Sequence, residues 1–118
     1  MATGLVQWAV AFAFTQAVEI PVYRRLLRTS TLASFGASAI THPVVWFVIP
    51  RLAPSFTDPG AAYIEYVARA EAFAFVVEAY YFASFHVVRM RRALLWSLLV
   101  NGASASAGFA SRWLFGWP

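Results

Sequence analysis

The stretch Glu19-Ile20-Pro21-Val22-Tyr23-Arg24-Arg25-Leu26-Leu27-Arg28 is where a long apolar run ends in a cluster of arginines. A second cluster, Arg89-Met90-Arg91-Arg92, also follows a long apolar run. Short basic clusters between apolar runs are the orientation signal of membrane proteins, because they are retained on the cytoplasmic side. The stretch therefore predicts that the chain crosses a membrane, turns in the cytoplasm and crosses back.

The composition agrees with lipid as the solvent. Of 118 residues, 61% are hydrophobic and 12% are charged, whereas soluble domains carry about 25% charged residues. So short a chain cannot bury that much apolar surface in water. This excludes a soluble enzyme and a disordered tail, and the lack of cysteine excludes a disulfide scaffold and a thiolate metal site. The net charge is +4, and most of the arginines lie in the two clusters. Because a nucleic-acid-binding surface needs a continuous basic stripe, we expect the bilayer, and no nucleic acid, as a partner.

Four apolar runs can be drawn, and each is near the ~20 residues that a helix needs to cross a bilayer. Their length and continuity favour helices over the ten-residue alternating segments of a membrane barrel. The sequence thus predicts an all-α integral membrane protein, a single four-transmembrane-helix bundle over residues 1–118. The expected spans are residues 5–23, 32–49, 63–88 and 93–115.

The arginine clusters follow the first and third spans, which predicts cytoplasmic turns there and both termini outside, in the periplasm. The expected location is the prokaryotic inner (cytoplasmic) membrane. Tyr23 is expected in the inner interfacial belt. At the outer side, Asp58 before Pro59 predicts a helix N-cap. The first turns of the third span should emerge there, with Glu65 and Arg69 paired at i,i+4 and Glu71 on the surface.

Polar residues within the spans need an explanation, because a charge near a helix centre costs roughly 2.5–3.5 kcal/mol. Counted from the arginines at ~1.5 Å per residue, Glu19, Glu78, Asn101 and His42 lie about 7, 16, 13 and 21 Å deep. They come one from each span. We expect these four side chains to face the bundle axis. The expected ligand- or proton-binding site consists of Glu19, His42, Glu78, Asn101, Tyr81 and Thr41. If a metal is bound, its ligands should be Glu19, His42 and Glu78; the sequence identifies no cofactor.

The polar and small residues of the spans can also be explained by purely structural roles. Glycines such as Gly36, Gly102 and Gly108 are typical of close helix packing. Asn101 can serve as an interhelical hydrogen-bonding residue, and Glu19 can extend to the cytoplasmic interface. Each span nevertheless carries a polar stripe around its special residue, which predicts a polar bundle axis.

A duplicated hairpin is a further hypothesis. Glu19 and His42 lie 23 positions apart, and so do Glu78 and Asn101. Both hairpins would enter from outside, so the repeat would be parallel, with its axis along the membrane normal.

Three functions remain open from the sequence. The first is binding or transport of a small ligand, proton or cation through the buried Glu/His/Asn site, as a homo-oligomer. The second is an accessory or assembly subunit of a larger membrane complex, whose polar stripes would point outward to partners. The third is an intramembrane metal- or carboxylate-dependent enzyme, which no local catalytic motif supports.

Overall fold

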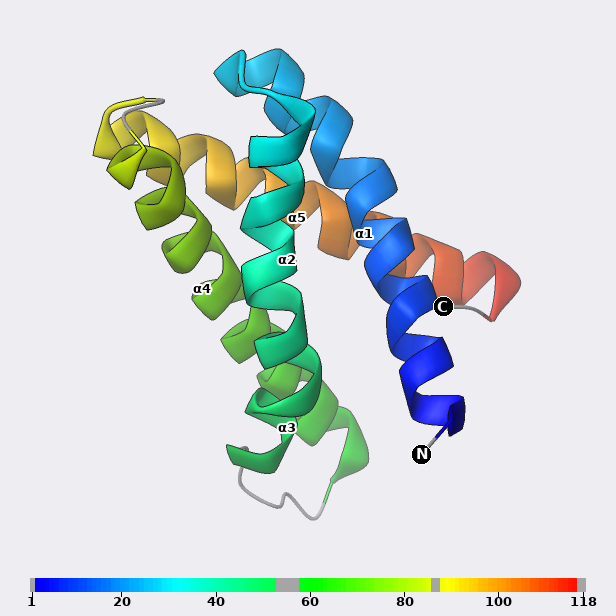
Figure 1. Ribbon diagram of the computed structural model, residues 1–118. Coiled ribbons are helices and arrows are strands. Elements are labelled where there is room, and N and C mark those ends of the chain that lie inside the picture. Colours follow the sequence, from blue (N-terminus) through cyan, green and yellow to red (C-terminus); the bar gives the residue numbers. More distant parts are fainter. Residues whose placement is uncertain (1, 53–57, 86–87, 117–118) are drawn as a thin grey trace.

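The computed structural model describes residues 2–52, 58–85 and 88–116, and within these ranges the chain forms helices and no strand. Four long helices and one short one follow each other along the chain (Figure 1). They are α1 (Ala2–Leu27), α2 (Thr31–Phe47), α3 (Ile49–Leu52), α4 (Pro59–Ser84) and α5 (Met90–Phe115). The predicted all-helical class is confirmed.

The helix ends follow local chemistry rather than the limits of the apolar runs. Asp58 caps α4 as predicted, since its carboxylate accepts the Gly60 amide at 3.0 Å with Pro59 in the first turn. The helix therefore begins before the expected residue 63, and it ends at Ser84 rather than at 88. Helix α1 continues through its arginines to Leu27, because an exposed arginine is a good helix former.

The two arginine clusters lie at the same end of the molecule, as the hairpin arrangement requires. Figure 1 shows the α1–α2 turn and the start of α5 at one end, with α3 and the starts of α1 and α4 at the other. A cleft between the turns is lined by Arg28 and Ser30 from the first and by Val88 and Arg92 from the second. Arg28 has left-handed backbone (φ 53°), which reverses the chain before Ser30 caps α2.

Helix α2 contacts both α1 and α4, and α5 contacts both α1 and α4. Each long helix therefore has two long neighbours, and α5 runs obliquely to the others in Figure 1. This arrangement encloses one face of every long helix along a common axis.

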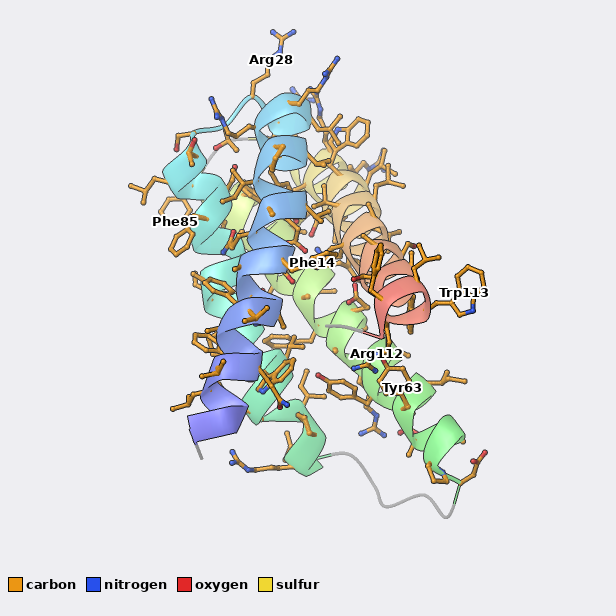
Figure 2. The ribbon with its side chains drawn as sticks, turned by 90° about the vertical axis from the view of Figure 1, so that its right-hand side faces the viewer. Phe14, Arg28, Tyr63, Phe85, Arg112 and Trp113 are labelled. Atoms are coloured by element: carbon orange, nitrogen blue, oxygen red, sulfur yellow. The ribbon has the colours of Figure 1, made fainter. Side chains whose placement is uncertain are left out.

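The distribution of side chains is the reverse of that in a soluble domain. Half of the buried apolar residues are alanines, such as Ala37, Ala74 and Ala79, and Phe82 is among the larger ones. Large apolar side chains face outward, such as Leu32 at 78% and Trp113 at 85% exposure, and Figure 2 shows Trp113 projecting away from the helices. Many exposed large apolar side chains on one molecule are typical of a surface that contacts lipid or another protein.

Two helical segments of the described chain are long and apolar enough to cross a membrane, Gly4–Leu27 and Met90–Phe115. Helix α2 has 17 residues, and α4 carries Glu65, Arg69, Glu71 and Glu78 along its length. Two spans are thus supported by length and composition.

Of the three glycines expected at close helix contacts, Gly36 alone packs closely. A Cβ added there would lie 2.5 Å from the Tyr81 hydroxyl oxygen. A Cβ added at Gly102 or Gly108 would meet no atom within 4 Å, so the close-packing interpretation is wrong for these two. Tyr81 itself packs edge-on against Phe82 and Phe85.

This contact predicts energetic coupling between positions 36 and 81. Tyr81→Phe removes the oxygen and leaves the ring carbon Cζ, 3.3 Å from the added Cβ, as the nearest atom. We expect Gly36→Ala to be about 1 kcal/mol more favourable in the Tyr81→Phe background than in the unmodified chain. A double-mutant cycle of thermal unfolding in detergent measures this, with Gly102→Ala as control. Strict additivity would contradict the contact.

Candidate functional site

Four helices bring polar side chains together around the carboxyl group of Glu78. This side chain lies in α4 and is 1% exposed. Its Oε1 accepts a hydrogen bond from the Thr41 hydroxyl of α2 at 2.8 Å. Its Oε2 accepts from Asn101 Nδ2 of α5 at 2.9 Å and from the Tyr23 hydroxyl of α1. Both oxygens are therefore satisfied by donors from three neighbouring helices.

The groups around Glu78 are themselves held in place. Asn101 Nδ2 also donates to the Ser97 carbonyl one turn earlier, at 2.9 Å, which uses both of its N–H groups. The Ser97 hydroxyl donates to the Phe75 carbonyl at 2.8 Å. The Tyr23 hydroxyl lies 3.2 Å from the Ser97 Oγ as well, but its contact with the Glu78 carboxylate is the shorter of the two. The donors are thus fixed toward Glu78 before any ligand arrives.

Glu19 forms a second buried carboxyl on α1, 2% exposed. The Ser38 hydroxyl of α2 donates to its Oε2, and the Ser104 side chain of α5 lies close enough to interact with the same carboxyl. Ser38 and Thr41 lie on one face of α2 and contact one carboxyl each. Helix α2 therefore links Glu19 and Glu78 through two hydroxyl groups.

Neither carboxyl has a cationic partner within residues 2–52, 58–85 and 88–116. The ion pair found there is the predicted one between Arg69 and Glu65 on the surface of α4. Burying two uncompensated carboxylates is expensive. The pair is consequently a place where a proton or a small cation can be held.

The structure buries Glu19, Glu78, Asn101 and Thr41 in one hydrogen-bonded region but does not bring His42 to it. The His42 ring packs against Phe12 and Trp46, with centroids 5.2 and 6.3 Å away. Its Nε2 lies 3.4 Å from the Thr15 hydroxyl. The described residues contain no group of three acidic or histidine side chains able to hold a metal. The expected trio of Glu19, His42 and Glu78 is thus not assembled.

The duplication hypothesis receives no support from these contacts. Asn101 bonds to Glu78, whereas His42 and Glu19 have Thr15 and Ser38 as their respective partners. Sequence spacing of 23 positions therefore produces a contact in one hairpin and not in the other.

The tyrosine of the site is Tyr23 rather than Tyr81. We expected Tyr23 in the inner interfacial belt, but its side chain is fully buried, because the end of α1 packs against Phe82 of α4, with ring centroids 4.6 Å apart. Thr15, Glu19 and Tyr23 follow one another at four-residue spacing, which puts them on one face of α1, and this signal could have identified Tyr23. Ser38 and Ser97 lay on such stripes too.

A cavity of about 190 Å³ opens beside the site, on the side away from the arginine turns. All four long helices contribute to it, and we call it the outer cavity. Its lining includes Phe14, Trp46, Tyr63, Glu71, Phe109 and Arg112. Figure 2 shows Arg112 of α5 beside Tyr63 of α4, and Arg28 at the opposite end of the molecule.

Glu71 is a site residue that sequence reasoning placed on the outer surface. In the structure its Oε2 atom is buried and has no hydrogen-bond partner among the described residues. Ser104 also lines the outer cavity and is a neighbour of the Glu19 carboxyl. The cavity thus reaches from Glu71 to the edge of the buried network.

Tyr23→Phe and Tyr81→Phe form a matched pair of substitutions that tests the network. The first removes a donor from the buried Glu78 carboxylate, so we expect it to lower the free energy of unfolding by about 1–3 kcal/mol. Tyr81 donates no hydrogen bond to this site, and its change should have a much smaller effect. Thermal unfolding in detergent compares them. Equal stabilities would show that Tyr23 contributes nothing to holding Glu78.

Comparisons with protein-family models, with curated proteins and with solved structures give no match. The functional interpretation therefore rests on the geometry of the chain itself. That geometry consists of two buried carboxyls without counter-cations, a fixed set of donors around one of them, and a cavity leading to the other.

Proposed function

We propose that the chain is a four-span bundle of the prokaryotic inner membrane that binds and exchanges a proton or small cation at Glu19 and Glu78. The observation that carries the proposal is the inverted distribution of side chains, with ionisable groups on the axis and large apolar groups outside. In a bilayer such residues face the bundle interior and mark ion pathways or proton relays. The bundle is 43 Å long, close to the ~40–45 Å of a bilayer with its headgroups.

The direction of the polar stripes favours this function over that of an accessory subunit. An accessory subunit would present polar side chains to partner helices. Here the hydroxyl, amide and carboxyl groups of the stripes are buried within one chain, including Ser34, Ser38, Ser97 and Asn101. The outer apolar surface is free for lipid, and for further copies of the chain in the homo-oligomer that we propose.

The two carboxyls differ in what their partners can do. An amide N–H can only donate, so the Asn101 group facing Glu78 favours a carboxylate there. Serine hydroxyls can donate or accept. Glu19, whose hydrogen-bond partner is Ser38 and which has the Ser104 hydroxyl as a neighbour, can therefore be hydrogen-bonded both as a carboxylate and as a carboxylic acid. We propose Glu19 as the group that gains and loses the proton, with Glu78 as the resident negative charge.

Exchange would then run between the outer cavity and the buried pair. Ser104 connects the cavity to Glu19, and Ser38 and Thr41 connect Glu19 to Glu78. Tyr23 lies beyond Glu78, near the arginine turn of α1.

Proton uptake by proteoliposomes tests the proposed function. With a trapped pH-sensitive dye and an imposed membrane potential, we expect the purified chain to admit protons faster than protein-free liposomes. Glu19→Gln should reduce the rate at least tenfold, because an amide cannot exchange the proton while Ser38 can still bond to it. Glu65→Gln is the control, since Glu65 pairs with Arg69 on the surface. Full uptake by both Glu19→Gln and Glu78→Gln would overturn the proposal.

Labelling of single cysteines tests the number of spans, because the chain has no cysteine of its own. Arg25→Cys, Ala61→Cys and Ser84→Cys place thiols at exposed positions of α1 and at the two ends of α4. In a four-span bundle, a membrane-impermeant maleimide should label positions 25 and 84 from one side of a vesicle and position 61 from the other. If α1 and α5 were the sole spans, all three would react from the same side.

A further inference from the structure

The outer cavity combines an unsatisfied carboxylate with aromatic walls. The Oε2 atom of Glu71 is buried and has no hydrogen-bond partner in the described part of the chain. Phe14, Trp46, Tyr63 and Phe109 line the same space. A carboxylate supplies an ion pair to a bound cation, and aromatic faces supply cation–π attraction. Together they form a site complementary to a cation with an apolar body.

The chemistry of the lining selects among cations. Hard metal ions such as Ca²⁺ require six to eight oxygen ligands, and Glu71 belongs to no metal-type cluster among the described residues. The volume of about 190 Å³ is below the roughly 300–1,000 Å³ of sites for drug-sized ligands. A compact organic ammonium ion fits both limits.

Arg112 already illustrates how this cavity receives a cation. Its guanidinium carbon lies 5.2 Å from the centroid of the Tyr63 ring, and its Nη1 donates to the Tyr63 hydroxyl at 2.8 Å. Arg112 and Tyr63 are more exposed than Glu71, so they lie toward the mouth. A positive charge at the mouth opposes the entry of a second cation and thereby limits its affinity.

We infer that the outer cavity binds a small monovalent organic ammonium ion, with Glu71 as its counter-ion and the aromatic side chains as its walls. This inference rests on the proposed function in one respect, since it names the class of cation that reaches the buried carboxyl pair. Binding itself requires only the folded chain. It can therefore be measured apart from proton exchange.

Calorimetric titration of the full chain in detergent, at constant ionic strength, tests the inference with two probes of equal shape. Tert-butylammonium carries the charge, and tert-butanol is its neutral counterpart. We expect saturable binding of the ammonium ion and at least tenfold weaker binding of the alcohol. Comparable binding of both probes would overturn the inference, because Glu71 would then contribute nothing.

Three variants and one control locate the site. Glu71→Gln should weaken ammonium binding at least tenfold, while Glu65→Gln, on the surface of the same helix, should leave it unchanged. Gly108→Leu should also weaken it, because Gly108 lines the cavity and an added Cβ there meets no atom within 4 Å. Arg112→Gln should strengthen it several-fold by removing the like charge.

The outcomes separate the two proposals. Thermal unfolding first establishes which variants fold. If Glu71→Gln does not fold, Gly108→Leu still tests whether the ammonium ion binds in the outer cavity. Unchanged ammonium binding in the folded variants would place the ion elsewhere and overturn the cavity site, whatever the proton assay gives. Loss of ammonium binding in Glu71→Gln, with proton uptake insensitive to Glu19→Gln, would support the cavity site and overturn the proposed exchange.

Discussion

The bundle depends on how the Glu78 carboxylate is satisfied away from water. A buried ionised group without hydrogen bonds costs several kcal/mol, and Glu78 is almost completely buried. Its donors come from α1, α2 and α5. Satisfying this one side chain therefore requires all four long helices to be in register. The interaction fixes the relative rotation of the helices more tightly than the packing of alanines alone, since small apolar faces can slide past each other.

The rest of the interior follows from that requirement. A network of serine, threonine and asparagine side chains leaves little room on the axis for large apolar groups, and these lie outside instead. In water, a chain with its large apolar side chains outside would lose most of the hydrophobic stabilisation of folding. In lipid the outer leucines and aromatics lose nothing by facing the solvent, and close helix contact with interhelical hydrogen bonds provides the association. A polar interior and an apolar exterior are thus the two features expected together in a chain that spans a membrane.

The sequence predicts the helical class and the polar axis, because both follow from periodicity and composition. Helical spacing placed Glu19, Glu78 and Asn101 on inward faces, and the structure confirms those faces. Depth was predicted less well, since it was counted along straight helices from the arginine clusters. Tyr23, adjacent to Arg24, was expected at the interface, yet it reaches the same carboxyl oxygen as Asn101. The oblique path of α5 and the early end of α4 alter the depths, and neither is encoded in residue spacing.

His42 and Glu71 were misplaced for a related reason. The depth and the helix face of an ionisable residue can be predicted from the sequence. Its contact partners depend on which neighbouring helix its side chain faces. His42 meets the aromatic side chains of α1 and α2, so its mid-span position does not bring it to the carboxyls. Glu71 lies midway along α4, but it was counted among the first turns of the third span, for which a surface position is the simplest expectation. In the folded bundle, the absence of side chains at Gly108 and the small size of Ser104 and Ala105 leave a space open beside Glu71, and that space is visible only once α5 is placed against α4.

The asymmetry between the two buried carboxyls is the feature that relates this packing to the exchange that we propose. If Glu78 and Glu19 were both surrounded by amide donors, both would favour the carboxylate, and the axis would hold two fixed negative charges. If both were held by hydroxyls, neither would be fixed, and the helices would lack the directional constraint that Asn101 supplies. The observed arrangement gives Glu19 hydroxyl neighbours, of which Ser104 borders the outer cavity. At Glu78 it adds the fixed amide donor of Asn101 to the Thr41 and Tyr23 hydroxyls. With a fixed charge at Glu78 and an exchangeable proton at Glu19, the bundle can stay folded in both protonation states of Glu19. The hydroxyl groups beside Glu19 can form hydrogen bonds to the carboxylate and to the carboxylic acid.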